Sequence, residues 1–286
     1  MSPALYALAA AFAFAVASIV LKRAFEYARP QMAAVFSVTF TTIFVWAVAV
    51  ATEPLSAVLT WRILPFVAAG LVAPGLARLL YYLGVHTIGV SRATTLVATQ
   101  PLVAVGLAVL VLGERPGSRV ILGAVAVVAG SALLSARGRD ERPWQRRHLV
   151  FPFLAAFGFA FRDVISRYGF HNFDNPVMAS AVATATSVVV MWSFAALGGA
   201  GRTLPDGPVF RLFALAGACE GVAYLLMWRA LATGQVSVVS PLVHSQPLFT
   251  IVLALIFLRD LERVTWRIVL ASALIIAGIA LIAGFR

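Results

Sequence analysis

The chain has 286 residues, of which 62% are hydrophobic and 12% are charged, and its formal net charge is +11. A soluble domain of this length needs far more polar surface, so this composition excludes a water-soluble globular protein and indicates a lipid environment. The cations are spread singly through short connectors instead of gathering on one face, which argues against nucleic acid as a partner. A single cysteine excludes a disulfide framework.

Ten segments of about twenty apolar residues follow one another, each long enough to cross a hydrocarbon core of about 30 Å. Lipid offers no partner to free backbone groups, so each segment must be helical. The chain is therefore predicted to be an all-α polytopic protein of the lipid bilayer, with the first segment kept as a membrane helix and not removed as a signal peptide. The spans are expected at residues 3–21, 31–51, 63–84, 90–112, 118–136, 149–168, 176–196, 208–230, 236–258 and 265–284.

One sequence pattern occurs twice, at residues 79–102 and again at 225–248. Each copy runs through a Val-Ser pair to a Gln-Pro pair in the middle of an apolar span, at 100–101 and at 246–247. Both copies continue through a further apolar run to a Glu-Arg pair and a last apolar segment. A duplicated membrane unit with matching interrupted helices is typical of secondary transporters.

The duplication divides the chain into a first five-helix repeat at 1–139, a basic connector at 140–148, and a second five-helix repeat at 149–286. Five is an odd number, so the second repeat must enter the membrane from the opposite side. The predicted architecture is therefore ten transmembrane helices in two inverted five-helix repeats around a central cavity.

The two Gln-Pro pairs are predicted to lie beside a binding site. A proline within a helix removes one backbone hydrogen bond and crowds the carbonyl four residues earlier, so Pro101 and Pro247 are expected to act as hinges. Gln100 and Gln246 would place an amide group beside each hinge. One proline kink is ordinary in a membrane helix, whereas two at equivalent positions favour a central site.

Charged residues within the spans are candidates for function, because a charge is expensive to place there. Arg78 and Glu220 lie in equivalent spans, where they either neutralise each other across a cavity or act separately. Acting separately, Arg78 would bind a carboxylate or phosphate, and Glu220 an amine or a proton. Asp163 is, after Glu220, the second candidate proton carrier. It follows Arg162 in the sequence, and since neighbouring side chains on a helix point about 100° apart, at most one of these two can face the cavity squarely. Purely structural ion pairs are the alternative for all four.

Aromatic and imidazole side chains complete the candidate site. Tyr81, Tyr82, Tyr224 and Trp228 follow the charged positions, and Tyr82 matches Trp228 in the repeat. Such rings suit a small amphipathic ligand, although Tyr and Trp also gather at membrane interfaces. His244 lies two residues before Gln246 and is a candidate for ligand binding or proton transfer.

Two further patterns are predicted to be structural. Glu114-Arg115 and Glu262-Arg263 fall just past helix ends, where each is expected to fix its connector to the following helix. Small residues such as those at 123–130 and 273–277 allow close helix approach, either inside the bundle or in a homodimer.

Together, the ten spans, the inverted units, the Gln-Pro pairs and the following Glu-Arg pairs resemble the EamA-type transporters of the drug/metabolite transporter superfamily. The resemblance covers essentially the whole chain. It implies a basket-like bundle around a central cavity that handles small metabolites, often exporting amino acids or related compounds. It also implies that the third, fourth, eighth and ninth helices contact substrate, which here offers Arg78, Tyr82, Gln100, Glu220, Trp228, His244 and Gln246.

Orientation has two opposed indications. Most of the 22 Lys and Arg residues lie in the odd-numbered connectors, which the positive-inside rule places in the cytoplasm, with both termini outside. The family resemblance implies instead that both termini are cytoplasmic. Both orientations stay open.

The leading hypothesis is a secondary transporter in the cell (inner) membrane that exports small metabolites such as amino acids by alternating access, with no cofactor or metal. The sequence carries no Gly-rich loop ending in Lys-Ser/Thr, no Gly-x-Ser-x-Gly motif and no aspartate cluster, so it is not expected to be an enzyme. A channel or a non-catalytic membrane partner subunit is the alternative. A partner subunit would tolerate loss of Arg78, Glu220 and both glutamines.

Overall fold

A computed structural model describes residues 1–24, 30–135, 145–197, 207–257 and 265–284. These residues form helices and contain no strand. Ten helical stretches among them are long and apolar enough to cross a membrane, which confirms the prediction of an all-α polytopic protein. They are Pro3–Leu21, Val35–Thr52, Trp61–Ile88, Val90–Leu112, Ser118–Ser135, Arg146–Gly169, Pro176–Leu197, Gly207–Thr233, Val236–Ile256 and Trp266–Ala283.

Each half of the chain supplies five spans. In the first half the helices are α1 (Pro3–Ala24), α2 (Pro30–Thr52), α3 (Leu64–Gly70), the π-helix η3 (Leu71–Leu76), α4 (Ala77–Ile88), α5 (Val90–Val97), α6 (Gln100–Leu112) and α7 (Ser118–Ser135). In the second half they are α8 (Val150–Gly169), α9 (Pro176–Leu197), α10 (Gly207–Thr233), α11 (Val236–Val243), α12 (Gln246–Phe257) and α13 (Trp266–Ala283). Short 3₁₀ helices are η1 (Leu55–Val58), η2 (Trp61–Ile63) and η4 (Arg146–Leu149).

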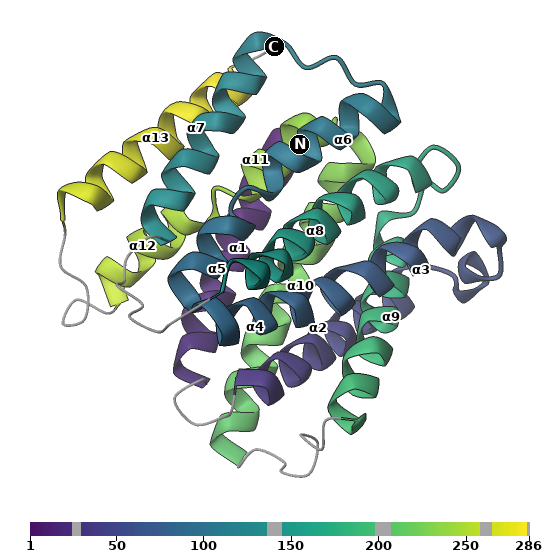
Figure 1. Ribbon diagram of the computed structural model, residues 1–286. Helices are drawn as coiled ribbons and strands as arrows, with labels where there is room; N and C mark the ends of the chain where they lie inside the picture. The colour runs from purple at the N-terminus through teal and green to yellow at the C-terminus, as the bar shows by residue number, and fades with distance from the viewer. Residues whose placement is uncertain (25–29, 136–144, 198–206, 258–264, 285–286) are drawn as a thin grey trace.

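Helices of the two halves pack against one another instead of forming two separate bundles (Figure 1). α1 packs along α10, α2 packs against α9 and α10, and α8 packs against α4 and α6. α7 and α13, the last helices of the two halves, pair at the left of the view. The main apolar core accordingly draws its buried side chains from both halves.

The fourth and ninth spans are broken at the same position of the repeat. α5 ends at Val97 and α6 begins at Gln100, while α11 ends at Val243 and α12 begins at Gln246. Each proline thus stands in the first turn of a new helix, where the missing N–H has no helical partner to lose. The Gln-Pro pairs therefore start helices after a two-residue turn, instead of bending one continuous helix as the sequence suggested.

The third span has a break that the repeat does not share. Within η3, Ala73 has extended backbone angles (φ −151°, ψ 132°), and α4 begins four residues later. The equivalent span of the second half, α10, runs as one helix from Gly207 to Thr233. This break therefore belongs to the third span and not to its equivalent in the second half.

Small residues hold α7 and α13 close together. A Cβ atom on Gly278 would lie 2.6 Å from the carbonyl oxygen of Gly123, and one on Gly130 would lie 2.6 Å from that of Ala271. Only glycine permits such an approach of two backbones. The small-residue pattern thus serves packing inside the bundle.

Glu114 joins the two halves. Its Oε1 atom accepts a hydrogen bond from the Val236 N–H at 2.7 Å, and its Oε2 atom accepts from the Ser237 N–H at 2.9 Å and hydroxyl at 2.6 Å. A carboxylate at a helix start satisfies free N–H groups and complements the helix dipole. The expectation that Glu114 fixes its own connector to the next helix is therefore wrong, because its partners begin α11 in the other half. Glu262 lies outside the described residues.

Replacing Gly278 by alanine is expected to lower the free energy of unfolding by about 1–3 kcal/mol, because the added methyl group meets the backbone of α7. Gly106→Ala is the matched control, since a Cβ there has nothing within 4 Å. Denaturant titration of both variants in detergent would measure the difference. Equal stability of the two variants would contradict the close packing of α7 on α13.

Candidate functional site

A cavity of about 640 Å³ lies in the middle of the bundle and is lined by both halves. Its size falls within the range of about 300–1,000 Å³ that small-molecule sites occupy. Its polar lining residues are Ser18, Ser37, Arg78, Tyr81, Tyr82, Thr94, Gln100, Ser131, Ser135, Arg162, Glu220, Tyr224, His244, Gln246 and Thr250.

Most of the predicted site residues line this cavity. Six do so as side chains expected to bind substrate, namely Arg78, Tyr82, Gln100, Glu220, His244 and Gln246. Of the two predicted hinge prolines, Pro247 lines the cavity, whereas Pro101 is buried and is not part of the lining.

Trp228 is buried away from the cavity. Its side chain is 1% exposed, and its ring centroid lies 5.7 Å from that of Phe66 and 6.1 Å from that of Phe170. Its equivalent, Tyr82, lines the cavity. The equivalent positions one residue earlier line the cavity in both spans, so the difference is confined to this pair.

Arg78 and Glu220 form an ion pair across the cavity wall. The Nη2 atom of Arg78 lies 2.7 Å from Oε1 of Glu220, and 20% of the Arg78 side chain stays exposed. The second carboxylate oxygen accepts hydrogen bonds from the hydroxyls of Ser37 at 2.5 Å and Thr41 at 3.3 Å. Of the two roles open to these residues, mutual neutralisation is the one that the structure contains.

A second ion pair joins the sequence neighbours Arg162 and Asp163. Nε and Nη2 of Arg162 donate to Oδ1 of Asp163 at 3.0 and 2.7 Å. Arg162 lines the cavity with its guanidinium 5.6 Å from the Phe159 ring centroid, while Asp163 is buried behind it. One member of the pair therefore faces the cavity, as the helical spacing requires. The other oxygen of Asp163 accepts from the hydroxyl of Ser240 at 2.9 Å and from the amide of Gln100 at 3.4 Å.

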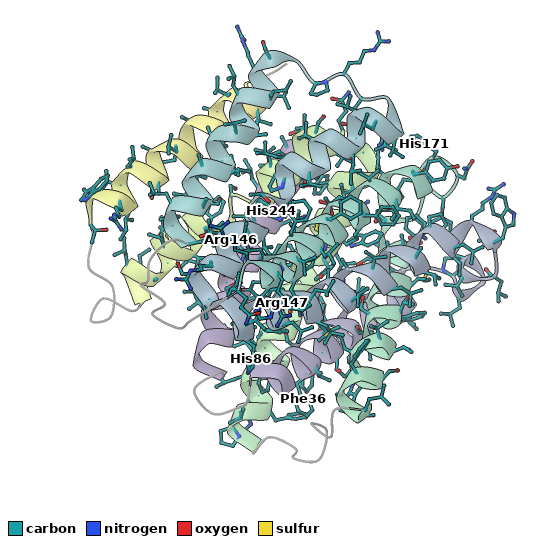
Figure 2. The ribbon with its side chains drawn as sticks, viewed as in Figure 1. Phe36, His86, Arg146, Arg147, His171 and His244 are labelled. Carbon is teal, nitrogen blue, oxygen red and sulfur yellow. The ribbon has the colours of Figure 1, made fainter. Side chains whose placement is uncertain are left out.

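His244 extends this second cluster toward the break in the ninth span. Its Nε2 atom lies 2.6 Å from Oε1 of Gln100, and its Nδ1 atom lies 2.8 Å from the carbonyl oxygen of Ser240. Figure 2 shows His244 among the helices near the centre of the view, whereas His171 lies toward the edge. Asp163, Gln100 and His244 therefore form a hydrogen-bonded chain from α8 through α6 to the turn between α11 and α12.

The two glutamines reach across the bundle in opposite directions. Gln100 of the first half contacts Asp163 and His244 of the second half. Gln246 of the second half donates to the hydroxyl of Ser18 at 2.8 Å and to the carbonyl of Phe14 at 3.3 Å, both in the first half. Each broken span is thus held to the opposite half by its glutamine.

Small hydroxyl residues complete these networks and were not predicted. Ser37 and Thr41 bind Glu220, Ser240 binds Asp163, and Ser18 binds Gln246. The sequence contains one signal for them, because Ser37 and Thr41 are four residues apart and share one face of α2. No group of three or more His, Cys, Asp or Glu side chains suited to a metal occurs in the described part of the chain.

Comparison with known proteins matches this architecture. A sequence model of the EamA-like transporter family matches residues 1–136 and 147–284. One solved crystal structure, described only as that of a protein, superposes with a TM-score of 0.82 at 16% identity, over 98% of this chain and 95% of the other. That likeness concerns the fold. No curated protein matches the chain in sequence.

Replacing Arg78 by methionine is expected to lower the free energy of unfolding by about 3 kcal/mol or more, because Glu220 then keeps a buried charge without its partner. The double variant Arg78→Met/Glu220→Gln should recover most of this loss. Arg62→Met, at an exposed arginine, is the control and should change stability by about 0.5 kcal/mol or less. Denaturant titration in detergent measures all three, and equal losses in the single and double variants would contradict the pairing.

Proposed function

The chain belongs to the EamA-like transporter family, and on that premise we propose that it is a secondary transporter that exports small metabolites such as amino acids. The family's members are transporters, and the ten spans make this chain a multi-pass membrane protein. We place it in the cell (inner) membrane, where an exporter of metabolites would act.

One observation carries the proposal: the central cavity is bounded by the broken fourth and ninth spans and by both halves of the bundle. Broken helices at the midplane expose backbone and side-chain polar groups to a substrate. In the proposed cycle, the helix starts at Pro101 and Pro247 act as hinges. Release of the contacts of Gln100 or Gln246 with the opposite half would open the cavity to one side of the membrane.

The polar groups of the wall suit a zwitterion. Arg78 keeps part of its guanidinium exposed and would bind the carboxylate of an amino acid. Glu220 would bind the ammonium group once its ion pair with Arg78 opens. The proposed substrate-binding residues are Arg78, Tyr82, Gln100, Glu220, His244 and Gln246. Trp228 is left out because it is buried behind the wall.

The first test is exchange of labelled amino acids and other small metabolites by the purified protein in liposomes. We expect saturable exchange of one class of compound. Exchange should fall about tenfold or more in Gln100→Ala/Gln246→Ala, because hydrogen bonds that are each worth about 1 kcal/mol are lost from both breaks.

The matched control is Gln145→Ala, which removes an exposed glutamine outside the cavity and should exchange like the native protein. Exchange that survives in the double variant would refute the placement of the site at the two breaks. Flux that never saturates and carries ions would favour a channel. No exchange of any compound by folded protein would favour a partner subunit.

A further inference from the structure

The hydrogen bonds around His244 define where its protons must be. A carbonyl oxygen can only accept, so the contact of 2.8 Å between Nδ1 and the Ser240 carbonyl requires a proton on Nδ1. This contact stays within one helical turn, from α11 to the residue that follows it. The protonation of the other ring nitrogen, Nε2, depends on Gln100.

The side-chain amide of Gln100 has one donating and one accepting end, so its orientation determines whether Nε2 of His244 carries a proton. With its nitrogen toward Asp163, its oxygen faces Nε2 of His244 at 2.6 Å, so Nε2 must carry a proton. With the amide turned over, its nitrogen donates to Nε2 and its oxygen faces the carboxyl group, so a hydrogen bond at that contact requires a proton on Asp163. In either arrangement, each contact of this hydrogen-bonded chain has one donor and one acceptor only when Asp163 and His244 together carry one proton more than a carboxylate and a neutral imidazole.

We propose that Asp163 and His244 bind one exchangeable proton through the amide of Gln100, and that this proton joins the two broken spans. The wall provides a route for exchange, because His244, Gln100 and Arg162 all line the cavity. The proposal assigns the proton site to this chain of three residues and not to Glu220. Both oxygens of Glu220 are already occupied by Arg78, Ser37 and Thr41.

The surrounding charges favour one of the two arrangements. From α8, Arg162 makes two hydrogen bonds to Oδ1 of Asp163, the geometry of a charged carboxylate, so the proton lies on Nε2 of His244. Arg78 on α4, and Glu220 and Tyr224 on α10, face the same cavity. From α7, Ser131 donates to the backbone carbonyl of His244 at 3.3 Å.

Loss of the proton would act on the breaks themselves. Gln100 is the first residue of α6, and His244 lies in the turn between α11 and α12. Without the proton, two acceptors would face each other at the contact of the Gln100 amide with either Asp163 or His244. That contact between the two halves would then open. In this respect the inference rests on the proposed function, because a carrier would couple proton release to opening of the cavity.

The site can be tested without any substrate. Protein labelled with ¹⁵N in its histidine rings would be placed in lipid nanodiscs and titrated between about pH 5 and about pH 9. The His244 signals are identified by their loss in His244→Gln. We expect the ring to lose one proton, from Nε2, while Nδ1 keeps its proton. In Gln100→Leu the midpoint should move by about one pH unit or more, because the carboxylate and imidazole are no longer linked.

His86, which is exposed on α4, is the internal control, and its titration should be the same in both proteins. Asp163→Asn serves as a second variant if Gln100→Leu does not fold. A His244 ring that loses its proton from Nδ1, that never changes across the range, or that titrates identically in native protein and variant would overturn the proposal. If the protein exchanges substrate in liposomes but His244 does not titrate, the proposed transport function stands and the proton site is refuted. If His244 titrates but no compound is exchanged, the proton site stands and the transport function is refuted.

Discussion

A charge buried among membrane-spanning helices is costly unless a partner lies within reach, and this constraint shapes the centre of the molecule. The carboxylates of Glu220 and Asp163 are each held by an arginine and by hydroxyl groups. Glu114 is held by the start of α11. The Glu220 and Glu114 contacts cross from one half of the chain to the other, so satisfying the charges also joins the halves.

Two glutamines add to these charged groups and help to make the cavity polar in the middle of an apolar bundle. Gln100 and Gln246 stand at the starts of α6 and α12, and each binds residues of the opposite half. The fourth and ninth spans are thus held to the opposite half at their breaks. Both glutamines also line the cavity, so the same side chains join the halves and form its polar wall.

Much of this arrangement could be predicted from the sequence, because it depends on local patterns. Apolar length defines the ten spans, and the matched Gln-Pro pairs locate the breaks. The partner of Glu114 could not be predicted, since it lies 122 residues away and is set by packing of the two halves. Trp228 was misplaced for a related reason. Its burial against Phe66 and Phe170 is set by tertiary packing, which the match to Tyr82 does not encode.

In the proposed cycle the cavity opens alternately to the two sides of the membrane. The decisive measurement uses Thr94→Cys, a cavity-lining position, in a Cys219→Ser background, labelled with an impermeant maleimide from each side of oriented vesicles. We expect labelling from both sides, with a transported compound shifting the balance between them, while the vesicles stay tight to ions. Labelling from one side only, whatever is added, would contradict it.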